Sequence, residues 1–143
     1  MDALTFLSGH VPLFEGVSAE ELTELAVNSV LRQYAAGKVV IYSGMTVEGL
    51  HVVATGKVEV HVKVPGKSGT QRVADLGPGD VFGEVSMVEK TMSAAAVKAG
   101  PEGAYVLVIP EEPFRRLVES NAAFGARVRE LIQARRSAPA PKP

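Results

Sequence analysis

The stretch of sequence that decides the fold is VFGEVSMVEKTMSAAAV, residues Val81 to Val97. It follows a Gly-Pro-Gly-Asp turn and opens with an aromatic residue, a glycine and an acid, Phe82-Gly83-Glu84. A glycine here lets the backbone approach a neighbouring group closely. Glu84 suits the first turn of a short helix, whose free N–H groups attract anions. Together with the small residues Ser93 to Ala96, such a helix predicts a cradle for one phosphate group. The alternative is a strand–helix–strand connection without a ligand, and this stretch alone favours neither.

The composition is that of an ordinary globular domain. The chain has 143 residues, enough for one domain with a hydrophobic core, and 46% of them are hydrophobic and 22% charged. The net charge is −1, so the chain lacks the excess of Lys and Arg that marks a surface for double-stranded DNA. We therefore expect one domain over residues 1–136 and no DNA binding.

The sequence contains no cysteine, which excludes disulfides, thiolate metal sites and thiol nucleophiles. This composition fits a reducing compartment. The N-terminal residues carry no basic segment ahead of a long apolar run, and no apolar run reaches the length of a membrane span. We expect a cytoplasmic protein without a membrane segment.

Two helices are predicted before residue 29. The first is short and covers residues 2–7. The second covers Ala19 to about Ala26, because Ser18 followed three residues later by Glu21 is a capping box. The apolar residues expected to pack ahead of the second helix are Val11, Leu13 and Phe14.

Short β-rich runs alternate with glycine turns between residues 29 and 110. The predicted strands are Val30–Tyr34, Lys38–Tyr42, Leu50–Ala54, Val58–Val64, Gln71–Leu76, Asp80–Phe82, Ala94–Ala99 and Tyr105–Ile109. Strands at this spacing indicate an antiparallel sandwich or barrel. We expect a tight turn at Thr55-Gly56 that pairs its two flanking strands. This pairing would bring His51 near His61, but without a third ligand we expect no metal site.

Two further helices and a tail are predicted after Pro110. Glu111 and Glu112 suit the start of the first helix, which Asn121 ends. The second covers about Ala122–Arg136 and carries an apolar stripe of Phe124, Val128, Leu131 and Ile132. We expect this stripe to pack on the strands and also to take some part in a dimer contact, as the corresponding helix does in several relatives. Residues 137–143, SAPAPKP, are expected to form a disordered tail.

Between Leu13 and Arg136 the chain resembles the cyclic-nucleotide-binding domain of catabolite activator proteins and of regulatory subunits of cyclic-AMP-dependent protein kinase. The resemblance starts at PLFEGVSAEELTELA, continues through the spaced glycines and peaks at LGPGDVFGEVSMV, residues 76–88, the opening of the family's phosphate-binding cassette. It implies a mainly β fold with flanking helices: an eight-stranded antiparallel, jelly-roll-like β-roll with an N-terminal helix and C-terminal B and C helices.

The resemblance also implies a ligand site in the cassette. In cyclic nucleotide binders the acid at the Glu84 position accepts the ribose 2′-hydroxyl, and an Arg later in the cassette clamps the cyclic phosphate. Ser93 stands at that Arg position here, so we expect weak or absent binding of cyclic AMP and cyclic GMP. The candidate ligand-binding residues are Phe82, Gly83, Glu84, Val85, Ser86, Lys90, Ser93, Ala94 and Ala95. His51 replaces a Tyr frequent in the family and is interpreted as a surface change.

Three functional interpretations remain open. The first is a non-catalytic regulatory or sensor module in signalling, with a nucleotide-like ligand that is bound weakly or not at all. The second is a ligand-free protein–protein interaction or dimerisation module that retains the fold. The third is a functional cyclic nucleotide binder in which another cation, such as Lys90, replaces the Arg. No group of residues suggests catalysis, and we expect a protein partner or a homodimer. Activator relatives carry a DNA-binding helix-turn-helix after the last helix; here SAPAPKP follows that helix, so we expect no specific DNA binding by the chain as given.

Overall fold

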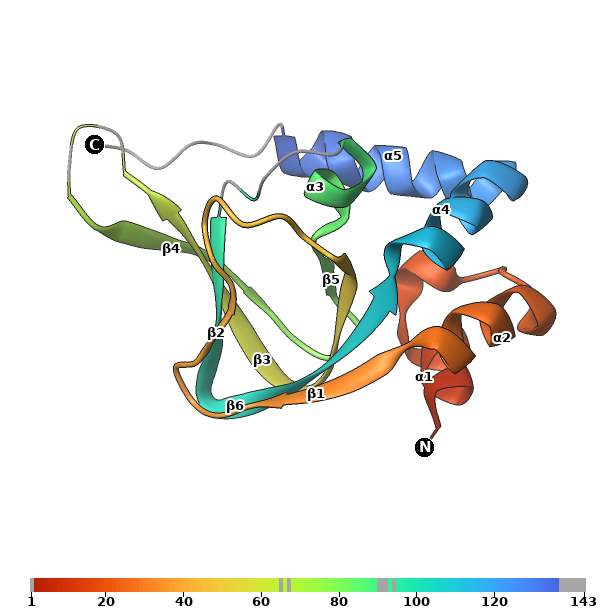
Figure 1. Cartoon of the computed structure of the whole chain (residues 1–143), viewed down its shortest axis with the longest axis horizontal. Helices are drawn as coiled ribbons and strands as arrows, with labels where there is room; N and C mark the ends of the chain where they lie inside the picture. Colours follow the sequence, from red (N-terminus) through yellow and green to blue (C-terminus); the bar gives the residue numbers. More distant parts are fainter. Residues whose placement is uncertain (1, 65, 67, 90–92, 94, 137–143) are drawn as a thin grey trace.

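The chain forms an antiparallel sheet that coils into a roll, with helices at one end and along its top (Figure 1). The computed structural model describes residues 2–64, 66, 68–89, 93 and 95–136. The strands are β1 (Val30–Tyr34), β2 (Val39–Ile41), β3 (Gly49–Lys63), β4 (Thr70–Leu76), β5 (Val81–Phe82) and β6 (Ala95–Pro110). Their order is β1-β6-β3-β4, with β2 paired to β6 and β5 paired to β3.

The helices flank this roll in the predicted order. They are α1 (Ala3–His10), the 3-10 helix η1 (Pro12–Phe14), α2 (Ala19–Asn28), α3 (Glu84–Glu89), α4 (Glu111–Ser120) and α5 (Ala122–Arg136). The bounds of α5 agree with the prediction, and the mainly β class with flanking helices is confirmed. The predicted tail, residues 137–143, lies outside the described residues.

Two long strands replace four of the predicted short ones, so the eight predicted runs appear as six strands. The expected turn at Thr55-Gly56 is wrong, because β3 runs through it and pairs with β6 on both sides. The register shifts at Val53/Thr55 and again at Gly56/Val58. Gly56 and Gly103 both have positive φ, and a Cβ on Gly56 would collide with the backbone oxygen of Gly103. The glycines therefore mark a bend that these two paired strands share, and not a reversal of the chain.

The continuity of β3 also separates the two histidines that a hairpin would bring together. His51 pairs with Val108 and Phe82, whereas His61 lies ten residues further along the same strand and pairs with Ala96. Within the described part of the chain, no three His, Asp or Glu residues are grouped so that they could hold a metal ion.

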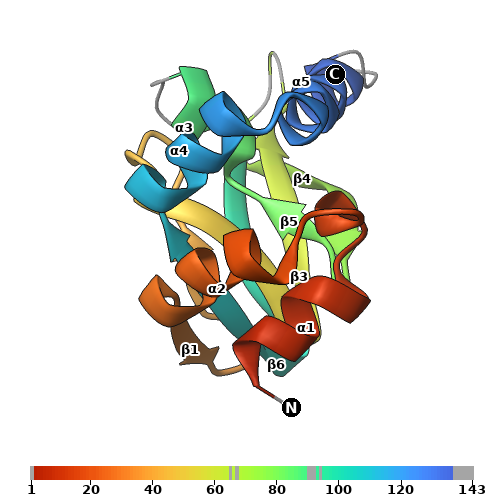
Figure 2. The same cartoon turned by 90° about the vertical axis from the view of Figure 1, so that its right-hand side faces the viewer.

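Alternation along the strands divides the buried side chains between two hydrophobic clusters. One face of the sheet packs against the helices; its cluster includes Leu50, Leu107 and Ile109 of the strands and Phe14, Phe114 and Phe124 of the helices. The other face lines the inside of the roll, where Val53, Val106 and Phe82 are buried. Figure 2 shows α1 and α2 in front of the sheet, with α4 and α5 above them in this view.

Polar contacts fasten the N-terminal helices to the C-terminal pair. The predicted capping box at Ser18 and Glu21 is present. The Glu21 carboxylate also accepts a hydrogen bond from Asn121 Nδ2 at 3.2 Å, and Arg116 of α4 donates to Glu24 of α2 at 2.5 Å. Asn121 both ends α4 and, through Oδ1, accepts a hydrogen bond from the Phe124 N–H in the first turn of α5. The α4–α5 junction is thus tied to α2.

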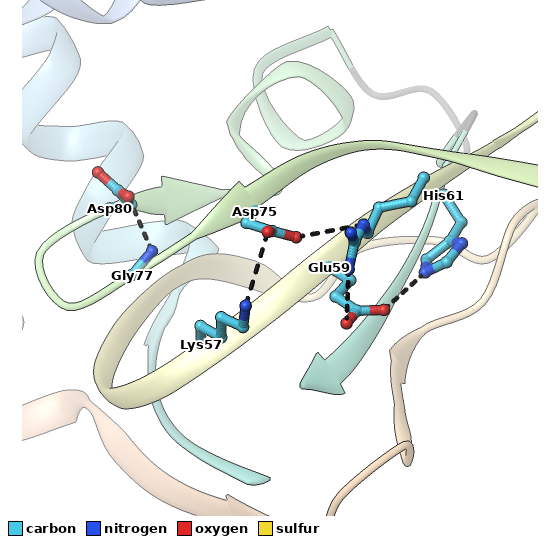
Figure 3. A network of polar contacts seen from close by, with 7 residues as sticks. Lys57, Glu59, His61, Asp75, Gly77 and Asp80 are labelled. Atoms are coloured by element: carbon cyan, nitrogen blue, oxygen red, sulfur yellow. Dashed lines mark hydrogen bonds and ion pairs between the residues drawn. The ribbon is translucent and has the colours of Figure 1, made fainter. Parts of the chain in front are cut away.

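A charged network lies on the surface of β3 and β4 (Figure 3). Asp75 contacts Lys57 at 3.6 Å and Arg72 at 3.7 Å, and Glu59 contacts Arg72 at 3.2 Å and His61 at 3.1 Å. The hydrogen bond from His61 and the charge of Arg72 lower the pKa of Glu59. The network joins side chains of β3 to side chains of its neighbour β4, an exposed strand at the edge of the sheet. Charged side chains on an edge strand oppose its pairing with strands of other chains. None of the described helices is long and apolar enough to cross a membrane.

Candidate functional site

The turn before the cassette positions the segment that carries Glu84. Asp80 accepts a hydrogen bond from the Gly77 N–H at 2.9 Å, and Figure 3 shows this contact closing the turn. Backbone bonds join Asp80 and Gly79 to Val53, so β5 is held against β3. The predicted short helix then begins at Glu84.

Gly83 makes the close approach that its position predicts, but the group that it approaches is part of the protein. Its φ is 90°, in the left-handed region that favours glycine. A Cβ there would lie 2.9 Å from Val47 Cγ1 and 3.2 Å from the Gly49 carbonyl oxygen. Gly83 is therefore required where the cassette crosses the start of β3.

The Glu84 side chain is buried, with 1% of its surface exposed, and it forms an ion pair with Arg135 of α5. Arg135 Nη1 donates to Glu84 Oε1 at 2.5 Å, and Nη2 donates to the Val81 carbonyl oxygen at 2.6 Å. One guanidinium therefore holds α5 against both ends of the Val81–Glu84 segment. Glu84 Oε2 is buried and accepts no hydrogen bond from any described residue.

Burial and ion pairing act on the acidity of Glu84 in opposite directions. Removal from water raises the pKa of Glu84, because it disfavours the charged form, and the charge of Arg135 lowers it again. The net result is a pKa above the ordinary value. A buried carboxylate oxygen without a hydrogen-bond partner is energetically costly, and buried polar groups of this kind are uncommon in folded proteins.

Ser93, at the position of the family's arginine, makes its hydrogen bonds within its own turn. Its hydroxyl donates to the Ala95 carbonyl oxygen at 2.6 Å and accepts from the Ala95 N–H at 3.3 Å. Its backbone pairs with Gly44 and Met45, between β2 and β3. Ser93 itself is therefore bonded to the neighbouring loop, while its hydroxyl bonds to the backbone of Ala95.

His51 is buried, which corrects the prediction of a surface change. Only 4% of the residue is exposed, since its place in β3 directs it against the cassette. The ring stacks on Phe82 with 5.0 Å between centroids, and Nδ1–H donates to the Gly49 carbonyl oxygen at 3.0 Å. Burial lowers the pKa of His51 to about 4, so the ring is neutral at physiological pH.

The other candidate residues differ in their surroundings. Phe82 is buried inside the roll, Val85 packs against the helix-side cluster, and Ala95 opens β6 opposite Val62. Ser86 lies in α3. Lys90 and Ala94 lie outside the described residues.

Arg135 is not among the site residues that the sequence predicts, although it contacts Glu84. The sequence does carry a signal for it. Arg135 lies three residues after Ile132 and seven after Val128, so it continues the buried stripe of α5 by helical spacing. A cation at the end of an apolar stripe indicates a buried partner for its charge.

The stripe itself packs inward. Phe124, Val128 and Ile132 are buried, and Leu131 packs against the same cluster. Phe124 stacks on Phe14 and meets Phe114 edge to face. The exposed positions described in α5 are alanines and the polar residues Arg129, Glu130 and Gln133. The stripe therefore packs on the domain, as predicted, while a dimer contact stays a prediction.

Comparison with known proteins connects this site to a family. The sequence profile described as "Cyclic nucleotide-binding domain" matches residues 31–121, which include all of the β-roll except Val30, and the cassette. The chain belongs to the cyclic nucleotide-binding domain family. This family is regulatory and usually non-catalytic.

Three relatives illustrate the range of proteins that contain such a domain. A cyclic AMP receptor protein from Thermus thermophilus is 39% identical over 92 residues, 61% of this chain and 41% of that protein. "Glutaminase 1" of Bradyrhizobium diazoefficiens is 33% identical over 85% of this chain but only 19% of its own length. The crystal structure of the Thermus thermophilus catabolite activator protein matches with a TM-score of 0.75 and 29% identity, covering 87% of this chain and 57% of that one.

The match to this chain thus spans 19% of the glutaminase and 41% of the cyclic AMP receptor protein. In the glutaminase it accounts for only a small part of the protein, so the match carries no enzymatic activity to this chain. What the cyclic nucleotide-binding domain here shares with these proteins is the roll, its cassette and the flanking helices.

Proposed function

We propose that this chain is a non-catalytic sensor module in which α5 responds to a small ligand at Glu84. The observation that supports this function is the pair of hydrogen bonds from Arg135 to Glu84 and to the Val81 carbonyl oxygen. Through these bonds the last turn of α5 contacts the residue at the family's ribose-binding position. Any group that binds Glu84 therefore acts directly on the contact that holds the last turn of α5 in place.

The mechanism requires a ligand that prefers one arrangement of α5 over another. A hydroxyl that donates to Glu84 would add to the interactions of the carboxylate and change the strength of its bond with Arg135. The change would pass through α5 to α4 and α2, because Asn121 and Arg116 tie these helices together. A protein partner or a second copy of the chain would then bind one arrangement preferentially.

Binding of cyclic AMP and cyclic GMP is expected to be weak or absent. A bidentate contact between Arg and phosphate is strong and geometrically specific, and Ser93 cannot make it. Loss of one partner of a buried charge pair costs roughly 2–5 kcal/mol, which weakens binding by roughly 30-fold to several thousandfold. The Ser93 hydroxyl offers little compensation, because it already donates to Ala95.

A second candidate function is a ligand-free interaction module. The observation in its favour is that Arg135 and Ser93 both bond to groups of the protein itself, so the cassette is stabilised without a ligand. In this case the fold would serve only as a binding surface for a protein partner or a second copy.

Isothermal titration calorimetry of the purified chain with cyclic AMP and cyclic GMP, carried to millimolar ligand, separates these functions when the variant Ser93→Arg is titrated beside it. We expect little or no heat from the natural chain and saturable binding by the variant. Saturable micromolar binding by the natural chain would overturn the expectation of weak binding and indicate a different cation as the clamp. Binding by neither protein would favour the interaction module.

A further inference from the structure

We propose that the outer edge of strand β1 is a dimerisation surface, on which β1 of a second copy of this chain pairs antiparallel to it. This inference goes beyond the proposed sensor function, because it involves neither Glu84 nor α5. It follows from a comparison of β1 with β4, the strands at the two ends of the path β1-β6-β3-β4.

Strand β1 offers a regular edge to a further strand. It pairs with β6 over five consecutive residues, Val30 to Tyr34, without a register shift. Among the described residues, β6 is its only strand partner, and no other backbone hydrogen bond involves these five residues. Figure 1 shows β1 along the bottom of the roll. The N–H and C=O groups that point away from β6 are therefore available to another strand.

Strand β4, by contrast, has features that oppose pairing with another chain. Its pairing with β3 leaves Val73 as an extra residue, which is a β-bulge. Arg72 and Asp75 of β4 form ion pairs with side chains of β3. Bulges and charges are common protections of edge strands. Strand β1 has no bulge and only one charged residue, Arg32, so its edge lacks both protections.

The exposed side chains at the β1 edge are mostly apolar. Val30 is 52% exposed and Leu31 is 55% exposed, on opposite faces of the strand. Tyr105 of β6 is also exposed and pairs with Gln33, which lies on the same face as Leu31. Val27, in the last turn of α2, is a further exposed apolar residue just before β1. Exposed apolar groups beside an unpaired backbone edge indicate a surface for another strand.

Pairing of β1 with its own copy allows few registers. Two identical strands related by a two-fold axis run antiparallel, and one residue faces its own copy. With Arg32 at the axis, two like charges would lie directly opposite each other, which is unfavourable. With Val30 at the axis, Gln33 would face Val27, which belongs to helix α2. With Gln33 at the axis, Val30 would face Ala36, which lies in the turn after β1.

The register with Leu31 at the axis avoids these conflicts. The two leucines face each other, and Val30 faces the aliphatic stem of Arg32 from the second copy. Ser29 then faces Gln33, and the Ser29 backbone is already extended, with φ −79° and ψ 154°. Residues 29–33 of both copies can therefore pair.

The charges at this edge also suit a second copy. Arg32 contacts Glu48 of its own chain at 3.9 Å, so neither copy brings an unpaired charge to the pairing. Five paired residues from each copy form a small interface, and we therefore expect a weak, reversible dimer.

Sedimentation velocity of the purified chain, from low micromolar to millimolar concentration, measures this association. We expect a reversible equilibrium between monomer and dimer. Leu31→Lys, which places two like charges at the axis, should raise the dissociation constant about tenfold or more. Val73→Lys, the matched change of an exposed residue on β4, should leave it unchanged. Thermal unfolding confirms that each variant is folded.

Two results of this experiment would overturn the inference. One is a natural chain that stays monomeric at every concentration. The other is a dimer that persists unchanged in Leu31→Lys, which would indicate a contact elsewhere, such as the one expected at α5.

Disulfide cross-linking tests the register, because the chain contains no cysteine of its own. Residues directly opposite in an antiparallel pair have Cα atoms about 4.5–5.5 Å apart, within the range of a disulfide. Leu31→Cys should therefore form a covalent dimer on mild oxidation. Ser29→Cys and Gln33→Cys should not cross-link alone but should do so when mixed. A yield from Leu31→Cys no higher than that from Val73→Cys, which measures random collision, would contradict the pairing.

Discussion

At the scale of single residues, the pair formed by Glu84 and Arg135 dominates the site. Replacement of Arg135 by Ala leaves a buried carboxylate without its counter-charge. We expect this variant to lose about 2–5 kcal/mol of unfolding free energy at neutral pH, towards the lower end because 33% of the Arg135 side chain is exposed. Urea unfolding measures the loss, with Arg129→Ala on the exposed face of α5 as the control.

The loss in Arg135→Ala depends on pH with a defined sign. Burial raises the pKa of Glu84 in the folded state above 4.5, so the folded chain holds this proton at a higher pH than the unfolded chain does. Without Arg135 to oppose this effect, stability falls as the pH rises above about 4.5 and recovers as it is lowered again. A loss of equal size at pH 5 and pH 7 would contradict a burial cost at Glu84.

His51 gives a pH dependence of the opposite sign. Its pKa is lowered from 6.5 to about 4, because burial disfavours the charged ring. The stability that this neutral ring contributes is present above pH 6.5 and is lost as the pH falls towards 4. The full effect is about 3 kcal/mol, at 1.36 kcal/mol per pKa unit. We expect chemical unfolding between pH 7 and pH 4 to show this slope in the natural chain and in His10→Gln, but a flatter one in His51→Gln.

Of the polar residues at this site, the sequence predicted Glu84 and Ser93 but not Arg135. Glu84 could be found because it lies in a motif of the family. Ser93 could be found because the end of that motif can be aligned at Val97, which places Ser93 at the position of the family's arginine. Arg135 lies 51 residues after Glu84, on a different element, so only the packing of α5 brings the two together. The burial of His51 could not be inferred either, since strand periodicity does not distinguish the inside of a roll from its outside.

At the scale of elements, the close pairing of β3 with β6 at their shared bend depends on Gly56. Its φ of 74° disfavours any other residue, and a Cβ would also collide with the backbone oxygen of Gly103. Gly37 has nearly the same φ, 76°, but an added Cβ there meets nothing within 4 Å. We expect Gly37→Ala to cost about 1–2 kcal/mol from φ alone, and Gly56→Ala to cost distinctly more. Equal losses in urea unfolding would mean that the two strands do not approach each other closely at this bend.

Element boundaries were predicted well where the signal is local. The capping box at Ser18 fixed the start of α2, and Asn121 marked the junction of α4 and α5. The failure at Thr55-Gly56 has a physical cause: a glycine with positive φ is required both by a tight turn and by a bend in a long strand. Which of the two forms depends on a partner strand that lies about 50 residues away.

At the scale of the whole molecule, the N-terminal segment connects to both ends of the site. The His10 carbonyl lies so close to Gly79 that no Cβ fits there, and Arg127 of α5 donates to the carbonyl oxygens of Leu13 and Glu15. The segment from His10 to Glu15 therefore contacts both the turn before the cassette and helix α5.

Removal of the Arg127 side chain tests this connection. Arg127→Ala deletes the donors to two backbone carbonyls, at a cost of about 1–3 kcal/mol. In hydrogen–deuterium exchange we expect faster exchange in residues 12–17 and in α5, with little change in β4. Arg129→Ala serves again as the matched control. Faster exchange confined to α5 would show that the N-terminal segment is held by its apolar contacts alone.

The position of Arg135 in the last turn of α5 has a consequence for how this domain joins other polypeptide. Terminal helical turns fray most readily, and their stability depends on the residues that continue the chain. A following segment that prolongs the helix would hold the guanidinium against Glu84, whereas one that unwinds its final turn would release it. The ligand affinity of the domain would then be set partly by its neighbour in the sequence, so that a fusion partner could tune the sensor without a single substitution in the pocket.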